Sequence, residues 1–333
     1  MILKQSDFSL TLVSEIFNKL QGLHNNVIQK VSIVGQNLYA LQYNNQQDPH
    51  NYVYRARKRR YPLFKQVFNA SQMAGGHTQT LDLANQPNMW FIGTKKNHFN
   101  WSTQLARVTI PSRSAHTSNT EFARLAYLNR AGRGLRVIED QGVDTYLPFR
   151  GNDLLRFDAA ISPAGKLLML VTIDQQTATL SKGNNGYFIL YDLAVINAAL
   201  DKVGIGYVNL GELPYLSEFY INHITAVDKI GSLQGFALDE ERNVYISSEF
   251  APSQGNLSQK PRRIIKITWG TWGSSNDQGW QILDFDQANI DILGYATELE
   301  NIQVISENNL YLTVSYHNGA GVTTRSRVYQ VKW

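Results

Sequence analysis

The stretch Leu233-Gln234-Gly235-Phe236-Ala237-Leu238 runs into a turn over residues 239–243 and then into Val244-Tyr245-Ile246. Apolar and polar residues alternate in both arms, which is the period of a strand that buries one face. Asp and Asn in the turn tolerate the backbone angles that a tight hairpin requires. The stretch therefore predicts a β-hairpin, and this unit decides the fold because it is repeated.

Four other copies of the hairpin unit occur in the chain. They begin with the segments Val27-Ile28-Gln29-Lys30-Val31, Thr78-Gln79-Thr80-Leu81, Ala159-Ala160-Ile161-Ser162 and Ile302-Gln303-Val304-Ile305. The repeat cores lie near residues 25–68, 72–112, 153–193, 229–268 and 296–333. Five units in 333 residues leave about 67 residues each, somewhat more than the roughly 40–50 of common propeller repeats. The surplus suits four-stranded blades joined by long loops.

The repeat predicts one all-β domain over residues 1–333, a β-propeller with mostly four-stranded antiparallel blades. A ring of blades protects its sheet edges, and the strand expected from Phe8 to Val13 would complete the last blade. Five blades are expected. Residues 112–150 contain no clear copy, which leaves a sixth, degenerate blade open.

Composition restricts the chemistry and the location of the protein. The chain has no cysteine, which excludes thiolate catalysis, cysteine-ligated metals and disulfides. It has no apolar run of the roughly 18 residues that a transmembrane helix needs. The first 20 residues lack the apolar core of a signal peptide, so we expect no cleavable leader. The sequence leaves the export route and the oligomeric state open.

A basic run carries much of the net charge of +4. It consists of Arg55, Arg57, Lys58, Arg59 and Arg60. On a strand, alternate residues share one face, so the run could bind a polyanion such as an anionic wall polymer. The alternative is a solvated edge strand whose charges prevent edge-to-edge pairing. No recognition module accompanies the run, so nucleic acid is not an expected partner.

No linear catalytic motif is present, and we expect no enzymatic activity. In a propeller, however, residues at the start of the innermost strands converge on one mouth of the channel. Asp158, Glu298 and Glu300 would meet there and could hold Ca²⁺, the one cofactor that the pattern leaves open. A calcium-dependent propeller hydrolase of the lactonase or esterase type is therefore one alternative function. The other interpretation is that these side chains only satisfy the polar groups of the channel mouth.

Aromatic residues offer a second kind of site. Trp269 and Trp272 lie in a loop rich in Gly and Ser, where exposed indoles could stack on sugar rings. The alternative is that both indoles fill space between blades.

Several strings resemble the helveticin J family of large, heat-labile bacteriocins. They are Ala74-Gly75-Gly76-His77-Thr78-Gln79-Thr80, Trp90-Phe91-Ile92-Gly93, Ser118-Asn119-Thr120-Glu121-Phe122, Tyr127-Leu128-Asn129-Arg130-Ala131-Gly132 and Leu312-Thr313-Val314-Ser315-Tyr316-His317, with Glu298 to Gln303 before the last. They occur in order from about residue 70 to the C-terminus.

The resemblance implies an extracellular antibacterial protein that kills related Gram-positive bacteria. The family has no catalytic triad to carry over. Polar residues within the matched strings are the candidate binding residues: His77, Asn119, Asn129, Arg130, Glu298 and Glu300. We expect the protein to bind a cell-wall glycan or an anionic wall polymer, and a non-catalytic propeller that binds a protein partner is a further alternative.

Overall fold

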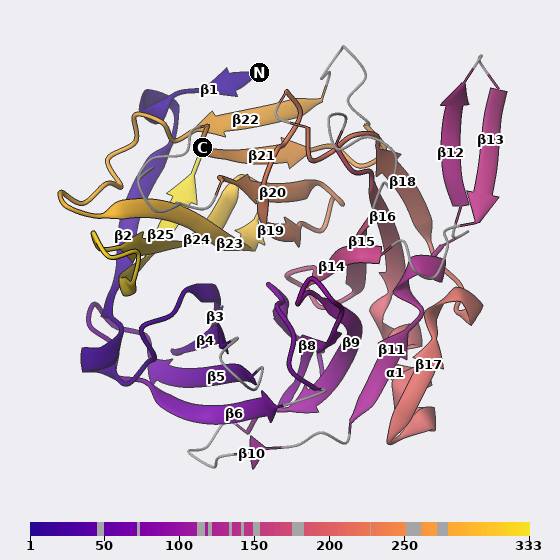
Figure 1. The fold of residues 1–333 in the computed structure, drawn as a ribbon, viewed down its shortest axis with the longest axis horizontal. Helices are drawn as coiled ribbons and strands as arrows, with labels where there is room; N and C mark the ends of the chain where they lie inside the picture. Colours follow the sequence, from indigo (N-terminus) through magenta and orange to yellow (C-terminus); the bar gives the residue numbers. More distant parts are fainter. Residues whose placement is uncertain are drawn as a thin grey trace.

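The computed structural model describes residues 1–44, 50–71, 74–111, 117–118, 122–132, 135–140, 143–148, 154–174, 183–226, 228–250, 261–271 and 279–333. Five small sheets surround a central axis as the blades of a propeller (Figure 1). The prediction of an all-β, five-bladed propeller is therefore confirmed.

Each blade begins at the channel and continues outward. Blade 1 contains β3 (Ile28–Val34), β4 (Asn37–Asn44), β5 (His50–Arg57), β6 (Lys65–Ser71) and β10 (Thr117–Ser118). Blade 2 contains β7 (Leu81–Leu83), β8 (Met89–Lys96), β9 (Ser102–Thr109), β11 (Ala123–Ala126) and β17 (Gly206–Asn209). Blade 3 contains β14 (Leu154–Ile161), β15 (Leu167–Asp174), β16 (Gly186–Asp192) and β18 (Ser217–Ile221).

The last two blades include strands from the N-terminus. Blade 4 contains β19 (Leu233–Leu238), β20 (Val244–Ser248), β21 (Arg263–Ile267), β22 (Trp280–Asp284) and β1 (Ile2–Leu3). Blade 5 contains β23 (Ala296–Ser306), β24 (Asn309–His317), β25 (Thr323–Lys332) and β2 (Ser9–Phe17). The antiparallel pairing of β2 with β25 confirms that an N-terminal strand completes the last blade.

Three blades are wider than the four strands that the repeat predicts. A short strand is added in parallel at the outer edge of blades 1, 2 and 4, namely β10, β17 and β1. These strands come from connections outside the repeat cores, which explains why the repeat does not show them. The described part of residues 112–150 contributes β10 and β11 to blades 1 and 2, and a separate hairpin of β12 (Leu135–Asp140) and β13 (Val143–Pro148) that projects outside the ring (Figure 1).

The helical elements are short. The α-helix α1 (Leu193–Val203) is capped by Asp192, whose carboxylate accepts the N–H of Ala194 at 2.8 Å. The 3₁₀ turns are η1 (Gln5–Asp7), η2 (Lys19–Gln21), η4 (Leu128–Arg130) and η5 (Leu210–Glu212). Within the described ranges, no helix has the length and apolarity needed to cross a membrane.

The hydrophobic core lies between the blades. Five clusters of buried side chains fill the five gaps between neighbouring blades. One example packs Ile16 of β2 and Val328 of β25 against Ile28 and Val31 of β3, which joins blade 5 to blade 1. Because middle strands are covered on both faces, a strand such as β20 is buried along its whole length. The ring therefore closes through apolar packing, and its polar side chains are left to the channel and the loops.

Candidate functional site

Polar side chains gather where the inner strands begin. The backbone N–H of Gln79, just before β7, donates to Asp158 of β14 at 3.1 Å. The Gln79 amide donates to Gln234 of β19 at 3.3 Å, and Gln234 donates to Glu298 of β23 at 3.1 Å. All four side chains are buried. The structure thus joins Asp158 and Glu298, which are 140 positions apart in the sequence, in one network across four blades.

Arg156 holds Asp158 in this network. The two residues are two positions apart on β14 and share one face. The Arg156 guanidinium lies 2.5 Å from the Asp158 carboxylate, donates to the Leu233 carbonyl at 2.9 Å, and lies 3.8 Å from the ring centre of Trp101. Because the pair is buried, Arg156 is the counter-charge that Asp158 needs there.

Three glutamates lie on the blade 4 and blade 5 side of the mouth. Glu249 follows β20 and accepts the N–H of Leu299 at 2.6 Å. Burial raises its pKa to about 9. Burial and the neighbouring Glu298 raise the pKa of Glu300 well above its usual range. Glu298 itself lies 2.8 Å from the ring of His317. Glu249 and Glu300 therefore favour the protonated form.

Two of the three acids proposed as calcium ligands are engaged by other side chains. In the part of the chain that the structure describes, no cluster of three or more His, Asp or Glu side chains is arranged to hold a metal ion. Ca²⁺ prefers several ionised or carbonyl oxygens that are free to turn toward it. Asp158 is engaged by Arg156 and by a backbone N–H, and Glu298 lies 2.8 Å from the ring of His317.

His77 belongs to a stack of flat side chains beside the mouth. Its ring is stacked on Trp101 with centroids 3.9 Å apart and on Tyr43 at 5.4 Å. Its Nε2 lies 2.7 Å from the Gln29 side chain of β3. Burial, together with the nearby Arg156, lowers the pKa of His77 to about 3. His77 is therefore a neutral ring that joins blades 1 and 2.

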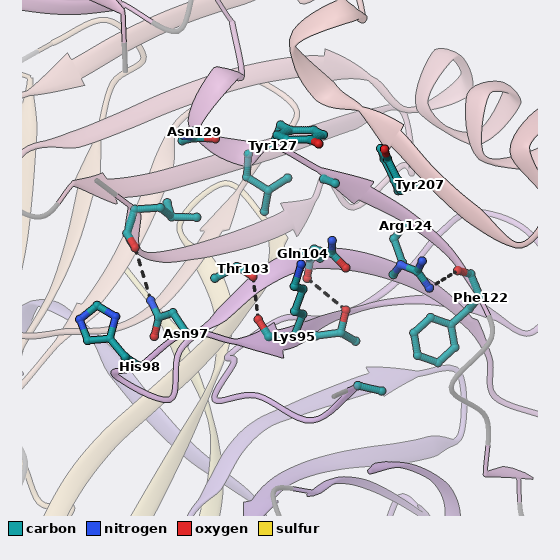
Figure 2. Close-up of a pocket in the computed structure, with 15 residues that line it drawn as sticks. Lys95, Asn97, His98, Thr103, Gln104, Phe122, Arg124, Tyr127, Asn129 and Tyr207 are labelled. Atoms are coloured by element: carbon teal, nitrogen blue, oxygen red, sulfur yellow. Dashed lines mark hydrogen bonds between the residues drawn. The ribbon is translucent and has the colours of Figure 1, made fainter. Parts of the chain in front are cut away.

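A separate pocket of about 890 Å³ opens on blade 2 (Figure 2). Its floor is formed by the β8–β9 hairpin and its wall by β11, η4 and β17. The polar and charged side chains described there are Thr94, Lys95, Asn97, His98, Thr103, Gln104, Arg124 and Asn129. Two cations and no carboxylate stand among the described lining residues. The pocket thus offers amides, hydroxyls and positive charge to a ligand.

Two exposed tyrosines form the rim of this pocket (Figure 2). Tyr127 is 43% and Tyr207 is 53% exposed, and their rings are 5.9 Å apart in an edge-to-face arrangement. Tyr127 has a φ of 55°, a left-handed conformation that is unusual for an aromatic residue. Arg130 lies 4.7 Å above its ring. The fold therefore holds an aromatic face toward solvent at some conformational cost.

Asn129 lines the same pocket from η4. It is 5% exposed, and its side-chain Nδ2 has no hydrogen-bond partner among the described residues. A buried amide N–H without an acceptor is destabilising by roughly 1–3 kcal/mol. An acceptor on a bound ligand would remove this cost. Asn129, proposed from the sequence, thus lines the pocket with the two tyrosines, while Arg130 stands over the Tyr127 ring and is not part of the lining.

The basic run lies at the end of β5 and in the loop that follows it. Arg57, Arg59 and Arg60 are exposed at the end of β5. Arg55 is half-buried and donates to the Pro111 carbonyl at 3.3 Å, and Lys58 donates to the Tyr311 hydroxyl at 3.2 Å. The run is therefore divided into two residues tied to the fold and three whose charges face solvent.

Three candidate binding residues from the sequence remain, and the structure describes one of them. Asn119 and Trp272 lie outside the described residues. Trp269 packs edge-on to Phe219 at 4.7 Å and donates to the Ser217 hydroxyl at 2.8 Å. That contact joins blades 4 and 3, which is the space-filling role that the sequence left as an alternative.

Several residues of these sites carry no sequence signal. Arg156, Trp101 and Glu249 become relevant only through contacts between blades. Tyr127 and Tyr207 come together because β11 pairs in parallel with β17. Tyr127 stands within one of the family strings, two positions before Asn129, and this position was the available clue.

Comparisons with known proteins agree with the strings in the sequence. The family model described as bacteriocin helveticin-J matches residues 5–333. The bacteriocin helveticin-J of Lactobacillus helveticus is 32% identical over 332 residues, covering 92% of each chain. The tail fibre of the Staphylococcus aureus phage P68 matches with a TM-score of 0.56 and 14% identity, over 98% of this chain and 53% of the fibre chain.

A putative exo-β-1,3-galactanase of Bifidobacterium bifidum s17 matches with a TM-score of 0.49 and 6% identity, over 97% of this chain and 94% of the enzyme. The likeness to the tail fibre concerns the fold alone, and the weaker likeness to the galactanase supports no conclusion about chemistry. The family match extends over nearly the whole chain and includes the strings around His77, Asn129 and Glu298. The chain belongs to the helveticin-J family of bacteriocins.

Proposed function

We propose that this chain is a secreted antibacterial protein that acts on related Gram-positive bacteria by binding a carbohydrate of the cell envelope in the Tyr127 pocket. Membership of a bacteriocin family supports the antibacterial role. The observation that carries the binding site is the buried, unpartnered Nδ2 of Asn129 in a pocket rimmed by Tyr127 and Tyr207, as seen among the described residues.

The chemistry of the pocket fits a sugar better than an apolar ligand. Sugar rings present C–H faces that pack on aromatic rings and hydroxyls that exchange hydrogen bonds with amides. Tyr127 and Tyr207 supply the first, and Gln104 and Asn129 supply the second. Lys95 and Arg124, without a described carboxylate in the lining, favour a sugar that carries a carboxylate or phosphate group.

The test is binding to purified cell walls and wall glycans of strains that the protein kills. We expect Tyr207→Ala and Tyr127→Asn each to weaken binding by about tenfold or more, as truncation of an aromatic anchor does. Asn is chosen at Tyr127 because it tolerates the left-handed backbone. Killing should fall in parallel with binding.

Two control variants separate the pocket from general effects. Tyr127→Phe keeps the ring face and should retain most of the binding. Tyr61→Ala removes an exposed tyrosine on blade 1 and should leave glycan binding unchanged. If wild-type protein kills target cells but binds no wall carbohydrate, or if the Tyr127 and Tyr207 variants bind as the wild type does, the pocket is not the receptor site.

We also propose that the protein acts by binding and not by hydrolysis. In support, two of the three channel-mouth acids that a calcium-dependent hydrolase would use are engaged, Asp158 by Arg156 and Glu298 by His317. Treatment with a calcium chelator should therefore leave wall binding and killing unchanged. Loss of killing on chelation, restored by added Ca²⁺, would instead support the hydrolase alternative.

A further inference from the structure

Blade 1 and the end of β2 carry a second surface, formed by two chain segments that run side by side. One segment is the end of β2 with η2, and the other is the loop from β5 to β6 (Figure 1). The N–H of Glu15 donates to the Arg60 carbonyl at 2.7 Å, and the N–H of Phe64 donates to the Gln21 carbonyl at 2.9 Å. These bonds hold the two segments together as one rigid edge.

The charge of this edge is strongly positive. Five cationic side chains are exposed on it: Lys19, Arg57, Arg59, Arg60 and Lys65. Glu15 is the one acidic residue in the sequence of the two segments, residues 14–22 and 57–65. It is buried, and its carboxylate accepts from Arg327 at 2.9 Å and also from Arg325. The Arg60 guanidinium also lies 3.7 Å from this carboxylate, and the other four cations have no acidic neighbour within the two segments.

Large apolar side chains stand among these cations. Leu20 is 83%, Leu63 is 60% and Tyr61 is 53% exposed. Leu20 lies in η2, beside the residue that bonds Phe64, so it is on the same edge as Leu63. We call these three residues with the five cations the basic–apolar surface. Exposed apolar groups collected in one place mark a surface that meets a partner.

The basic–apolar surface and the Tyr127 pocket lie on different blades, the surface where blade 5 meets blade 1 and the pocket on blade 2. The inner strands begin at the mouth where Gln29 contacts His77, and Gln79 contacts Asp158. The pocket stands at that side, because it is built from the end of β8, which pairs with the start of β7. Arg57 pairs with Asn37, just after the end of β3, and so lies at the other end of its blade from the mouth.

We propose that the basic–apolar surface docks on an anionic phospholipid bilayer. Cations are attracted to lipid phosphates, and each contributes a factor of about five in affinity near an anionic surface. A soluble wall polymer or a nucleic acid would satisfy the charges but would leave both leucines in water. A bilayer accepts them in its interfacial region, as it does the apolar face of peripheral proteins.

Vesicle sedimentation tests this docking. The probes are vesicles of phosphatidylglycerol mixed with phosphatidylcholine, and vesicles of phosphatidylcholine alone. We expect binding to the first that weakens as salt increases, and little binding to the second. Arg57→Ser with Arg59→Ser should weaken binding by about 30-fold, the effect of two charges. Leu20→Ser with Leu63→Ser should weaken it by roughly tenfold or more, from the apolar area no longer buried.

Matched variants on other surfaces serve as controls. Leu216→Ser with Leu293→Ser removes two exposed leucines elsewhere and should leave vesicle binding unchanged, as should Tyr207→Ala. Unchanged thermal unfolding of each variant excludes a folding defect. Absence of binding to the anionic vesicles overturns the proposal. Unchanged vesicle binding by the Leu20 and Leu63 variant also overturns it. If soluble poly(glycerol phosphate) in addition displaces the protein fully from the vesicles, attraction of the cations to any polyanion accounts for the binding.

This proposal does not depend on the glycan site. The Tyr207→Ala variant should lose wall binding and keep vesicle binding, whereas the Leu20 and Leu63 variant should do the reverse. Failure of one site is therefore distinguishable from failure of the other.

Discussion

Replacement of Glu249 by Gln should stabilise the protein at neutral pH. Glu249 is 1% exposed and stands directly after β20, with its Oε2 accepting the N–H of Leu299 at 2.6 Å. Burial raises its pKa from 4.5 to about 9, with Glu298 and Asp291 adding to the effect and Arg262 opposing it. Between these two values the folded protein holds a proton that the unfolded chain has released. Stability of the wild type therefore falls as the pH rises through that window.

The size of the effect follows from the unfolded pKa. At pH 7 the unfolded chain is about 2.5 pH units above its carboxyl pKa of 4.5, at about 1.36 kcal/mol per unit. The protonation of Glu249 on folding thus destabilises the folded protein by about 3 kcal/mol. This value does not depend on the pKa of Glu249 in the folded protein as long as that pKa is above about 8. The glutamine side chain of the variant has no proton to take up, and its amide oxygen can still accept the Leu299 N–H. For 333 residues, about 3 kcal/mol corresponds to roughly 5 °C in Tm.

The measurement is urea unfolding of wild type and Glu249→Gln from pH 4.5 to pH 8.5. The difference in the free energy of unfolding should be close to zero at pH 4.5 and should grow by about 1.4 kcal/mol per pH unit. Glu300 adds a pH dependence of its own, whose main causes, burial and Glu298, are present in both proteins. Glu241→Gln, at an exposed acid, should match the wild type within about 0.5 kcal/mol. A constant difference across the pH range, or a Glu249→Gln variant less stable than the wild type at pH 7, would falsify the assignment of a buried neutral carboxyl.

Three further changes test how the blades are held together. Arg156→Ala leaves Asp158 buried without its counter-charge and should lower the free energy of unfolding by about 3–5 kcal/mol, measured in urea at pH 7; a loss below about 1 kcal/mol would contradict the buried pair. Gly235→Ala places a methyl carbon 2.5 Å from the Asn301 Cα, so we expect the free energy of unfolding to fall by about 1–3 kcal/mol and Tm to fall with it. An unchanged Tm would mean that β19 and β23 are less closely packed. Deletion of residues 1–17 removes β2 and leaves β25 as an open edge, so we expect aggregated protein on size-exclusion chromatography. Moving that segment to the C-terminus through a short linker should restore a folded protein. A soluble, folded deletion variant would contradict the role of β2 in closure.

The blades could be predicted from the sequence because each hairpin depends on local information. Alternation of apolar residues and turn residues such as Asn308 act within about ten positions, and these are the features that the repeats preserve. The sequence predicted a closing strand from Phe8 to Val13, and the structure has this strand from Ser9 to Phe17. The added strands β10 and β17 were not predicted, because two to four residues in a long connection carry no recognisable period.

The sites could be predicted only in part. Asp158 and Glu298 were expected at one mouth and lie in one network there, because the fold itself places the starts of the inner strands together. The state of that network was not predictable. It depends on Arg156, on burial and on Glu249, a residue after a strand with no distinguishing neighbours in the sequence.

The sequence by itself determined the class of fold and the family and favoured five blades, since these rest on periodicity and on strings of adjacent residues. Only the tertiary structure decided which side chains form a site. Tyr127 and Tyr207 are 80 positions apart, and their rings meet because β17 was added to blade 2 in parallel with β11. Likewise, Leu20 and Leu63 share an edge through a few backbone hydrogen bonds. Contacts between distant residues depend on how the blades close, and no local pattern encodes that closure.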